Sequence, residues 1–293
     1  MARRIDFSQL RNKLRQIEAK QRQAIARHNQ QVRKYNQAVR NLQAALNRYN
    51  GEVRAYNSRR RLHQQRLNSE LARLRSRSAS SHVNFRTSVT RLHESYKRLE
   101  HAAAARPLSA PENFFLDLAE RETANSVGVL NAVEAPEPTT APASDLQQTT
   151  ITDEIAVISE DLDSRWRGAL FALHPGNPEA ARHFCTSARE IFVEIFELKA
   201  PDGVVFQAIP ACPRTERGNA TRRSKMAYLL TQKGVSLDAL TDFANEDVGN
   251  VMELFDLFNS GTHGASGRFD LSTLGAIKRR VEDGLLFLSR LAA

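Results

Sequence analysis

The sequence has little of what marks a membrane, secreted or disulfide-bonded protein. It contains no run of about 18 uninterrupted apolar residues, and its first twenty residues carry charge throughout instead of an apolar signal segment. Its two cysteines, Cys185 and Cys212, are too few for a disulfide framework and lack the C-x-x-C spacing of a zinc site. We therefore expect a reduced, cytoplasmic protein without a membrane partner, and we predict no metal site and no cofactor.

Negative charge is scarce in the first third of the chain, and proline is absent before Pro107. Residues 1–106 hold 25 Lys and Arg against 6 Asp and Glu, a net charge of +19. Residues 107–163 hold 1 basic residue against 12 acidic ones, a net of −11, and residues 164–293 hold 16 against 15, a net of +1. Net charge bears on partners and solubility rather than on the fold. These shifts predict a basic coiled coil (1–106), an acidic linker (107–150) and a helical domain (151–293).

Apolar and aromatic residues recur at steps of three and four from Phe7 to Tyr56, which is the heptad seam of a coiled coil. The seam carries an internal repeat: H-N-Q-Q-V-R begins at His28, Y-N-Q-A-V-R at Tyr35 and Y-N-G-E-V-R at Tyr49. Tyrosine at a seam position buries its ring but must give its hydroxyl a partner. This seam is therefore expected to be wetter and less stable than one built from Leu and Ile.

The N-terminal helix is expected to be long and to need a partner. A helix from about Phe7 to Arg75 would span roughly 100 Å. The run R-S-R-S-A-S-S at 75–81 predicts a turn, and a second, shorter helix restarts the apolar pattern between Phe85 and Leu99. An antiparallel hairpin or an intermolecular coiled coil would each cover the seam, because a lone amphipathic helix has nothing to bury its stripe against. We expect a homo-oligomer.

Arginine is concentrated along this segment. One interpretation is a phosphate-binding rod that contacts nucleic acid without reading its sequence. The other is a solvated helical face that pairs with an acidic protein surface, including the acidic segment of this same chain. The residues concerned are Arg40, Arg54, Arg59, Arg60, Arg61, Arg66, Arg73, Arg75 and Arg77.

The middle of the chain has the composition of a tether. Residues 134–150 combine Pro, Ala, Thr and acidic residues without an apolar period, which is typical of an extended, disordered linker. Ahead of it, Pro111 to Val133 predicts a short helix.

The C-terminal domain is expected to be all-α, with at most one short strand pair. Apolar spacings predict helices over about 152–173, with Thr152 and Asp153 as the cap, and over about 178–198, 237–259 and 271–291. Residues 204–210 give the one plausible strand, which is too isolated to form a sheet alone. A compact helical domain of this size can bury its own core.

Two pairs of residues in this domain are candidates for catalysis. Asn259 and His263 lie in a Gly-rich connection after an apolar helix, and histidine most readily moves a proton at neutral pH. Arg189 and Glu190 lie mid-helix beside an apolar face, where a buried pair would be costly unless matched. The alternative interpretations are a histidine that packs at a helix end and ordinary surface charge.

A basic cluster in the same domain is a candidate for phosphate contacts, with a solvated helix end as the alternative. Its members are Arg214, Arg217, Arg222, Arg223 and Lys225.

Two stretches, W-R-G-A-L-F-A-L-H-P-G-N-P-E-A-A-R-H-F-C-T-S-A-R-E and L-F-D-L-F-N-S-G-T-H-G, resemble the predicted nucleases that associate with prokaryotic PIWI-type systems. More broadly, they resemble HEPN-type helical domains, over about 165–290. The resemblance implies metal-independent RNA cleavage by an R-N-x-x-x-H arrangement that assists attack of a 2′-hydroxyl on the adjacent phosphate. Asn259 and His263 match this arrangement, but Phe258 stands where the Arg belongs. Arg189 or Arg182 would have to supply the cation.

These features predict a nuclease or degenerate nuclease of a bacterial defence or conflict system, whose basic coiled coil binds nucleic acid or mediates assembly. The alternative is a non-enzymatic scaffold whose helical domain and coiled coil bind protein partners.

Overall fold

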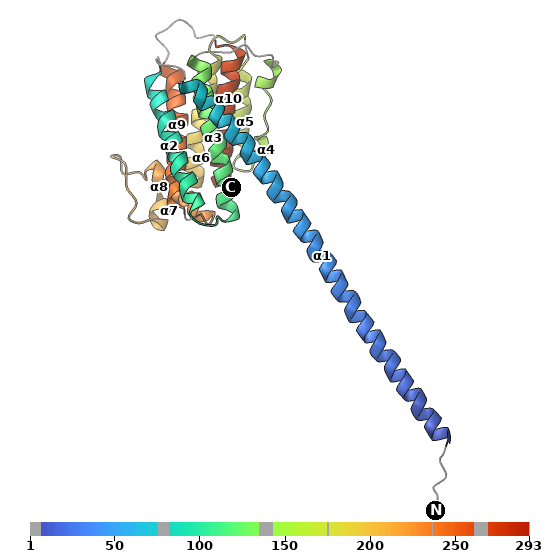
Figure 1. The fold of residues 1–293 in the computed structure, drawn as a ribbon. Coiled ribbons are helices and arrows are strands. Elements are labelled where there is room, and N and C mark those ends of the chain that lie inside the picture. Colours follow the sequence, from blue (N-terminus) through green and yellow to red (C-terminus); the bar gives the residue numbers. More distant parts are fainter. Residues whose placement is uncertain are drawn as a thin grey trace, which may run out of the picture. The chain divides into compact units, whose positions relative to one another are not determined.

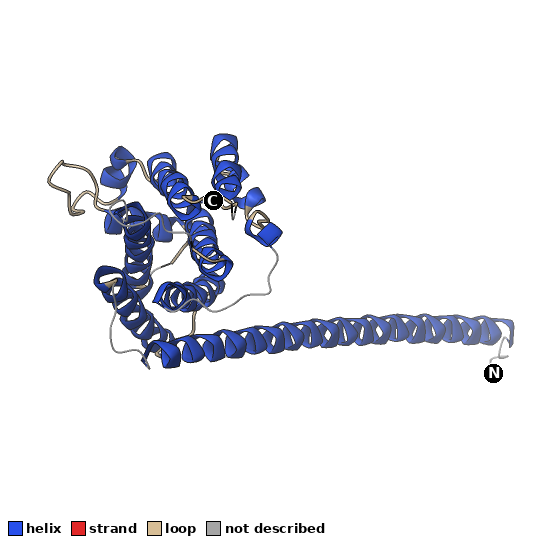
Figure 2. Cartoon of the chain, turned by 90° about the horizontal axis from the view of Figure 1, so that it is seen from above, coloured by secondary structure: helices blue, strands red, loops and turns tan. Residues whose placement is uncertain are grey.

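The computed structural model describes residues 7–75, 82–134, 143–174, 176–235, 237–260 and 269–292, without the side chains of residues 7–10, 75, 259 and 260. All elements in these ranges are helical apart from one isolated bridge between Arg214 and Ala220 (Figures 1 and 2), so the all-α prediction is confirmed. The helices are α1 (Phe7–Arg75), α2 (Val83–Ala104), α3 (Ala110–Glu134), the 3-10 helix η1 (Ala143–Leu146), α4 (Thr152–Ala156), α5 (Glu160–Ala172), α6 (Ala180–Lys199), α7 (Asp202–Ala208), α8 (Arg222–Gln232), α9 (Asp238–Ser260) and α10 (Leu271–Ala292).

The chain divides into two compact units, Met1–Arg61 and Leu62–Ala293. The predicted boundaries at 106 and 150 do not coincide with this division. The physical reason is that α2 and α3 bury apolar faces against α9 and α10, and so share a core with the C-terminal helices.

The first unit consists of the greater part of α1. Proline is absent from this helix, and side chains one turn apart bond to each other, as Gln37 Nε2 does to Asn41 Oδ1 over 3.1 Å. The seam side chains from Leu14 to Val53 are exposed. The single chain thus contains the predicted long helix, whereas its coiled-coil pairing stays a prediction.

The second unit is a helical bundle in which α2 packs against α9 and α3, α10 against α3, and α6 against α5, α9 and α10. Edge-on aromatic contacts join these helices, with ring centroids 5.7 Å apart for Phe115 and Phe287 and for Phe192 and Phe255. Trp166 is fully buried beside Phe184. The core therefore includes α2 and α3, which lie outside the predicted domain 151–293.

Two side-chain hydrogen bonds join the last turns of α1 to α2. Gln64 Nε2 donates to Glu100 Oε1 over 3.3 Å, and Arg86 Nη2 donates to the backbone oxygen of Leu74 over 3.4 Å. Leu67 is buried here. The apolar face of α2 packs against α9 and α3, so the predicted pairing of the whole of α1 with α2 in a hairpin is not found among the described residues.

The acidic segment is not a tether where the structure describes it. Helix α3 is largely buried, and Glu112, Glu120 and Glu122 are among its buried residues. After 135–142, which lie outside the described residues, Leu146 of η1 is buried in the core. The helix predicted from Pro111 to Val133 is therefore confirmed as α3, but it belongs to the bundle and not to a linker, because three of its carboxylates are buried. Residues 143–150 are not an extended tether either, because η1 buries Leu146. These three buried carboxylates are therefore not available to neutralise the positive charge of α1.

Two local predictions also fail. Residues 204–210 lie mostly in helix α7, which follows extended Pro201, carries Asp202 in its first turn and buries Val205. No partner strand exists for this run among the described residues. The helix expected at 152–173 is split, because Ser159 takes an extended N-cap conformation before the acidic first turn of α5. Thr152 does not cap α4, since its N-cap is Ile151 without a side-chain bond.

Candidate functional site

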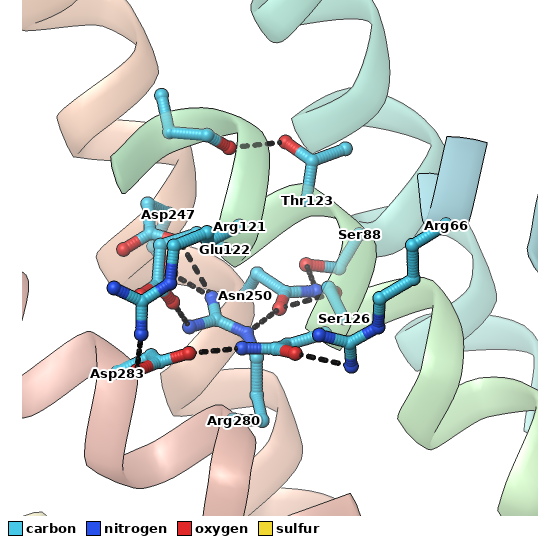
Figure 3. Close-up of polar contacts among 12 residues, drawn as sticks. Arg66, Ser88, Arg121, Glu122, Thr123, Ser126, Asp247, Asn250, Arg280 and Asp283 are labelled. Carbon is cyan, nitrogen blue, oxygen red and sulfur yellow. Dashed lines mark hydrogen bonds and ion pairs between the residues drawn. The ribbon is translucent and has the colours of Figure 1, made fainter. Parts of the chain in front are cut away.

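A buried arginine, Arg280 of α10, is the centre of a polar network inside the bundle (Figure 3). One terminal nitrogen pairs with Glu122 of α3. The other donates to Asp247 Oδ1 over 2.6 Å and to the backbone oxygen of Asp247 over 3.2 Å, and Nε donates to Asn250 Oδ1 over 3.1 Å. Each guanidinium nitrogen therefore has a partner, which is the condition for burying this cation.

Asn250 adds a second contact with α3 to the network and extends it to one further helix, α2. Ser126 Oγ of α3 donates to Asn250 Oδ1 over 2.6 Å, and Asn250 Nδ2 donates to Ser88 Oγ of α2 over 3.2 Å. All three side chains are buried. The network thus fixes α2, α3, α9 and α10 relative to one another.

The electrostatics of the network follow from two carboxyl groups beside one guanidinium. Burial, reinforced by the charge of Asp247, raises the pKa of Glu122 well above its ordinary value, although Arg280 opposes the shift. Burial also raises the pKa of Asp247. The site is closed to solvent, since Arg280 and Glu122 have no exposed surface. Its geometry therefore serves packing and orientation rather than contact with a substrate.

A second chain of contacts leads from this network toward the surface. Asp283 of α10 accepts hydrogen bonds from Arg121 and from Asn125 Nδ2 of α3. Asn125 Oδ1 in turn accepts from Arg66 Nη2 of α1 over 2.6 Å. Figure 3 shows this line of side chains from α10 to α1. It holds the exposed Arg66 in place through a neutral amide.

Arg66 opens onto a pocket of about 150 Å³, here called the basic pocket. Its walls come from α1, α3 and α10, and it holds three arginines but one carboxylate. The lining residues are Arg66, Glu70, Arg73, Asn125, Gly128, Asn131, Ala132, Ser272, Ala276 and Arg279.

The carboxylate of the basic pocket is already engaged. Glu70 Oε2 accepts from Asn131 Nδ2 over 2.7 Å and lies 3.6 Å from Arg73 Nη1. Arg279 makes no ion pair within the described ranges, and burial together with the charge of Arg66 lowers the pKa of its guanidinium. A guanidinium remains protonated despite such a shift. The pocket therefore carries surplus positive charge.

The structure describes the side chains of two of the four predicted catalytic residues, Arg189 and Glu190. Arg189 of α6 donates from Nη1 to Asp256 Oδ1 of α9 over 2.9 Å, while Glu190 is exposed. Phe258 is buried against Phe269, with ring centroids 5.0 Å apart. An arginine at 258 would thus fall in the core, whereas Arg189 reaches α9 from the neighbouring helix.

His263 and the side chain of Asn259 lie outside the described residues. Before them, α2 and α9 enclose a second pocket of about 290 Å³, here called the α2–α9 pocket. Its lining residues are His82, Val83, Asn84, Phe85, Glu253, Asp256 and Leu257.

The structure separates the predicted basic cluster into individually held side chains. Arg223 Nη2 pairs with Asp242 at 2.6 Å, and buried Lys225 lies 3.0 Å from Glu197 and 3.1 Å from Asp202. Acidic residues of α6, α7 and α9 therefore form ion pairs with these two cations.

The remaining members of the cluster have different surroundings. The guanidinium of Arg214 lies 3.8 Å over the ring centre of Phe206. Burial lowers the pKa of Arg222, whose Nε donates to Asn245 over 3.4 Å. Arg217 is exposed in the loop before α8. The described contacts leave Arg217 as the most open cation of the cluster.

The arginines predicted along α1 divide between the two units. Arg40, Arg54, Arg59 and Arg61 are exposed and Arg60 is half-buried in the first unit. Arg66 and Arg73 line the basic pocket of the second unit. Their role toward nucleic acid stays a prediction, as does that of Arg75, whose side chain is not described, and of Arg77, which lies outside the described residues.

Three side chains could together offer metal ligands. The ligand atoms of His63, Asp117 and Glu120 lie within 4.8 Å of one another. His63 Nδ1 is 3.6 Å from Asp117 Oδ1, which is also the geometry of an ion pair. Imidazole and carboxylate groups suit zinc, but three ligands fall short of a closed structural site.

Sequence reasoning missed Arg279, Arg280 and the polar face of α3. A signal was present, because Arg280 follows Ile277 and precedes Val281 and Gly284 on the apolar stripe of its helix. A charged residue at such a position needs a buried partner. Periodicity alone does not say which helix supplies that partner.

These observations define a helical-bundle protein with a buried ionic network and a surface pocket rich in arginine. Residues 156–288 match a family model described as predicted pPIWI-associating nuclease. The match confirms the resemblance expected over about 165–290. It includes Arg189, Asp247 and Arg280 and leaves out α1, α2 and α3.

No curated protein and no solved structure matches the chain. In the described part of the chain, no helix has both the length and the apolar character that crossing a bilayer requires.

Proposed function

We propose that this protein is a nuclease, or a degenerate nuclease, of a prokaryotic defence system, and that arginines of α1 hold its nucleic-acid substrate. The observation that carries this proposal is the family match over residues 156–288. The excess of arginine along α1 supports it, because phosphate contacts by Arg and Lys provide most of the sequence-independent affinity for nucleic acid.

The chemistry is assigned to the C-terminal end of α9. His263 exchanges a proton with the attacking 2′-hydroxyl or with the leaving oxygen. Arg189 stabilises the charge that develops on the phosphate, and Asn259 orients the scissile group. The pairing of Arg189 with Asp256 supports this assignment, since it brings a cation to within one helical turn of Asn259. The α2–α9 pocket, to which Asp256 belongs, offers space beside it.

The test is cleavage of labelled RNA and DNA of one sequence by the full chain, in EDTA and in Mg²⁺. His263→Ala and Arg189→Ala should each lower the cleavage rate by about 100-fold or more, because acid–base groups and charge-stabilising donors contribute on that scale. Arg165→Ala is the matched control, since Arg165 is an exposed arginine of α5 that pairs with Asp161 at 2.7 Å. If His263→Ala and Arg189→Ala both cleaved in EDTA as fast as the control variant, the assignment would be wrong.

A scaffold function is favoured by one feature, the exposed apolar seam of α1. Leu42, Leu46 and Tyr49 are all exposed in the single chain. As a coiled coil, this seam would join copies of the chain or bind a helical partner. Sedimentation of the full chain should then show an oligomer that Leu42→Asp with Leu46→Asp dissociates. A monomer at all concentrations would contradict self-assembly through the seam.

A further inference from the structure

The basic pocket brings three guanidinium groups together with only one carboxylate among its lining residues. Of its three arginines, Arg73 lies beside Glu70, Arg66 is held by an amide oxygen, and Arg279 has no ion-pair partner within the described ranges. We propose that this pocket binds a phosphate monoester, such as the terminal phosphate of an oligonucleotide. The proposal concerns binding and goes beyond the nuclease function above.

The charge of the pocket selects the ionic form of the ligand. Three guanidinium groups against one carboxylate leave a formal surplus of two positive charges. A phosphate monoester carries a charge of about −1.5 to −2 at pH 7. A phosphodiester within a nucleic-acid strand carries only one negative charge. The pocket therefore matches a terminal phosphate better than an internal one.

The donors are oriented before any ligand arrives. Arg66 uses one of its nitrogens to donate to Asn125, and Asn125 is itself fixed by Asp283, which Arg121 also holds (Figure 3). A guanidinium offers five N–H groups in a rigid fork that matches phosphate geometry. Arg66 thus retains donors for a ligand while its position is set by α3 and α10. Such pre-organisation reduces the ordering cost of binding.

The size of the pocket limits what can enter. Its volume is about 150 Å³. This is enough for one phosphate group and part of the sugar that bears it, but not for a length of strand. Arg66 and Arg279 are solvent-exposed residues, so the ligand has access from outside. A chain end, or a small phosphorylated molecule, fits these limits.

The experiment uses the full chain and 2′-O-methyl oligonucleotides, which lack the 2′-hydroxyl that cleavage would use. Fluorescence anisotropy at fixed salt compares one sequence with a 5′-phosphate, a 3′-phosphate or hydroxyl ends. We expect one phosphorylated form to bind at least about 10-fold more tightly than the hydroxyl form. Arg279→Gln should abolish this preference and leave the affinity for the hydroxyl form within about twofold. Arg290→Gln is the matched control, because Arg290 is an exposed arginine of α10 that pairs with Glu154 at 2.8 Å.

A second measurement distinguishes a phosphate at the end of a strand from a free phosphate or a small phosphorylated molecule. Inorganic phosphate should raise the melting temperature of the wild type and of Arg290→Gln, but not that of Arg279→Gln. Stabilisation by inorganic phosphate without any end preference assigns the pocket to a free or small phosphate. The proposal would be overturned if the wild type showed no preference for a phosphorylated end and if phosphate stabilised it no more than it stabilised Arg279→Gln. Neither readout depends on His263, so loss of the nuclease assignment would leave this result intact.

Discussion

Arg280 of α10 donates a hydrogen bond of 2.6 Å to the carboxylate of Asp247 on α9, and both side chains are buried. The same guanidinium holds Glu122 of α3. Ions in a protein interior are tolerated only when paired and hydrogen-bonded. The three residues therefore form a connection that positions the helices around which the candidate sites lie.

Removing Arg280 should strongly destabilise the second unit. Arg280→Met leaves Glu122 and Asp247 buried without their cation, and such a loss costs about 3–5 kcal/mol. The free energy of unfolding can be followed in urea by the fluorescence of Trp166, which is the single tryptophan and is fully buried. Arg290→Met, at an exposed ion pair of the same helix, should cost less than about 1 kcal/mol. Equal losses for the two variants would show that the network contributes no special stability.

Stability at acid pH should depend on Glu112 at the start of α3. Its carboxylate accepts from both terminal nitrogens of Arg106 and from the backbone N–H of Ser109, and these bonds lower its pKa from 4.5 to about 2. Because the folded pKa is depressed, the contribution of Glu112 is present above about pH 4.5 and is lost as the pH falls through about 2.

Glu112→Gln tests this dependence. It should cost about 1–3 kcal/mol at pH 7, since charge-assisted hydrogen bonds are lost. The difference from the wild type in the free energy of unfolding should shrink as the pH is lowered from 5 toward 2. A difference that is the same at every pH would contradict the pKa assignment.

Two glycines of α10 should respond in opposite directions to alanine. A Cβ at Gly284 would lie 3.2 Å from atoms of Arg280, Phe192 and Val251, all of which are buried and cannot yield. Gly284→Ala should therefore cost about 1–3 kcal/mol by overpacking.

Gly275 is the matched position, because a Cβ there meets its nearest atom at 3.6 Å, an ordinary contact. Gly275→Ala should gain up to about 1 kcal/mol from helix propensity. Urea unfolding of both variants decides the matter, and a stabilising Gly284→Ala would mean that α6 and α9 pack less closely on α10 than described.

Nucleic-acid binding by α1 should depend steeply on salt. For duplex DNA the slope of log K against log salt is about −0.9 for each phosphate contacted. Replacing Arg54, Arg59 and Arg61 by Gln in the full chain should make that slope shallower by up to about 2.7. Arg223→Gln, whose partner is Asp242, should leave it unchanged. A flat response of the wild type between 50 and 200 mM salt would rule out the phosphate-binding role of α1.

Much of the fold follows from local pattern. The steps of three and four, the absence of proline and the break near 75–81 predict α1 and α2, and similar spacings predict α6, α9 and α10 within a few residues. Predictions from periodicity and composition fail where packing against other helices decides whether a short segment is helical or an acidic segment is buried. Residues 204–210 are β-rich in composition but lie mostly in α7, and α3 is acidic in composition but lies inside the bundle.

The candidate sites divide in the same way. The sequence identified Arg66, Arg73 and Arg189 as candidates, but it did not show that Arg189 meets Asp256 or that Arg279 joins Arg66 and Arg73. These pairs are separated by tens to hundreds of residues along the chain. Only packing brings them together, so periodicity within one helix carries no information about them.

The sequence by itself determined an all-helical chain with a long N-terminal helix, an uneven distribution of charge and a C-terminal segment that resembles a family of predicted nucleases. Helical periodicity and the distribution of charge follow directly from the order of the residues, so they can be found without a structure. The tertiary structure alone decided which charges are buried and which face solvent. Arg280 and Arg279 are neighbours in the sequence, yet α10 turns the first into the core and the second into the basic pocket, because adjacent residues of a helix point about 100° apart.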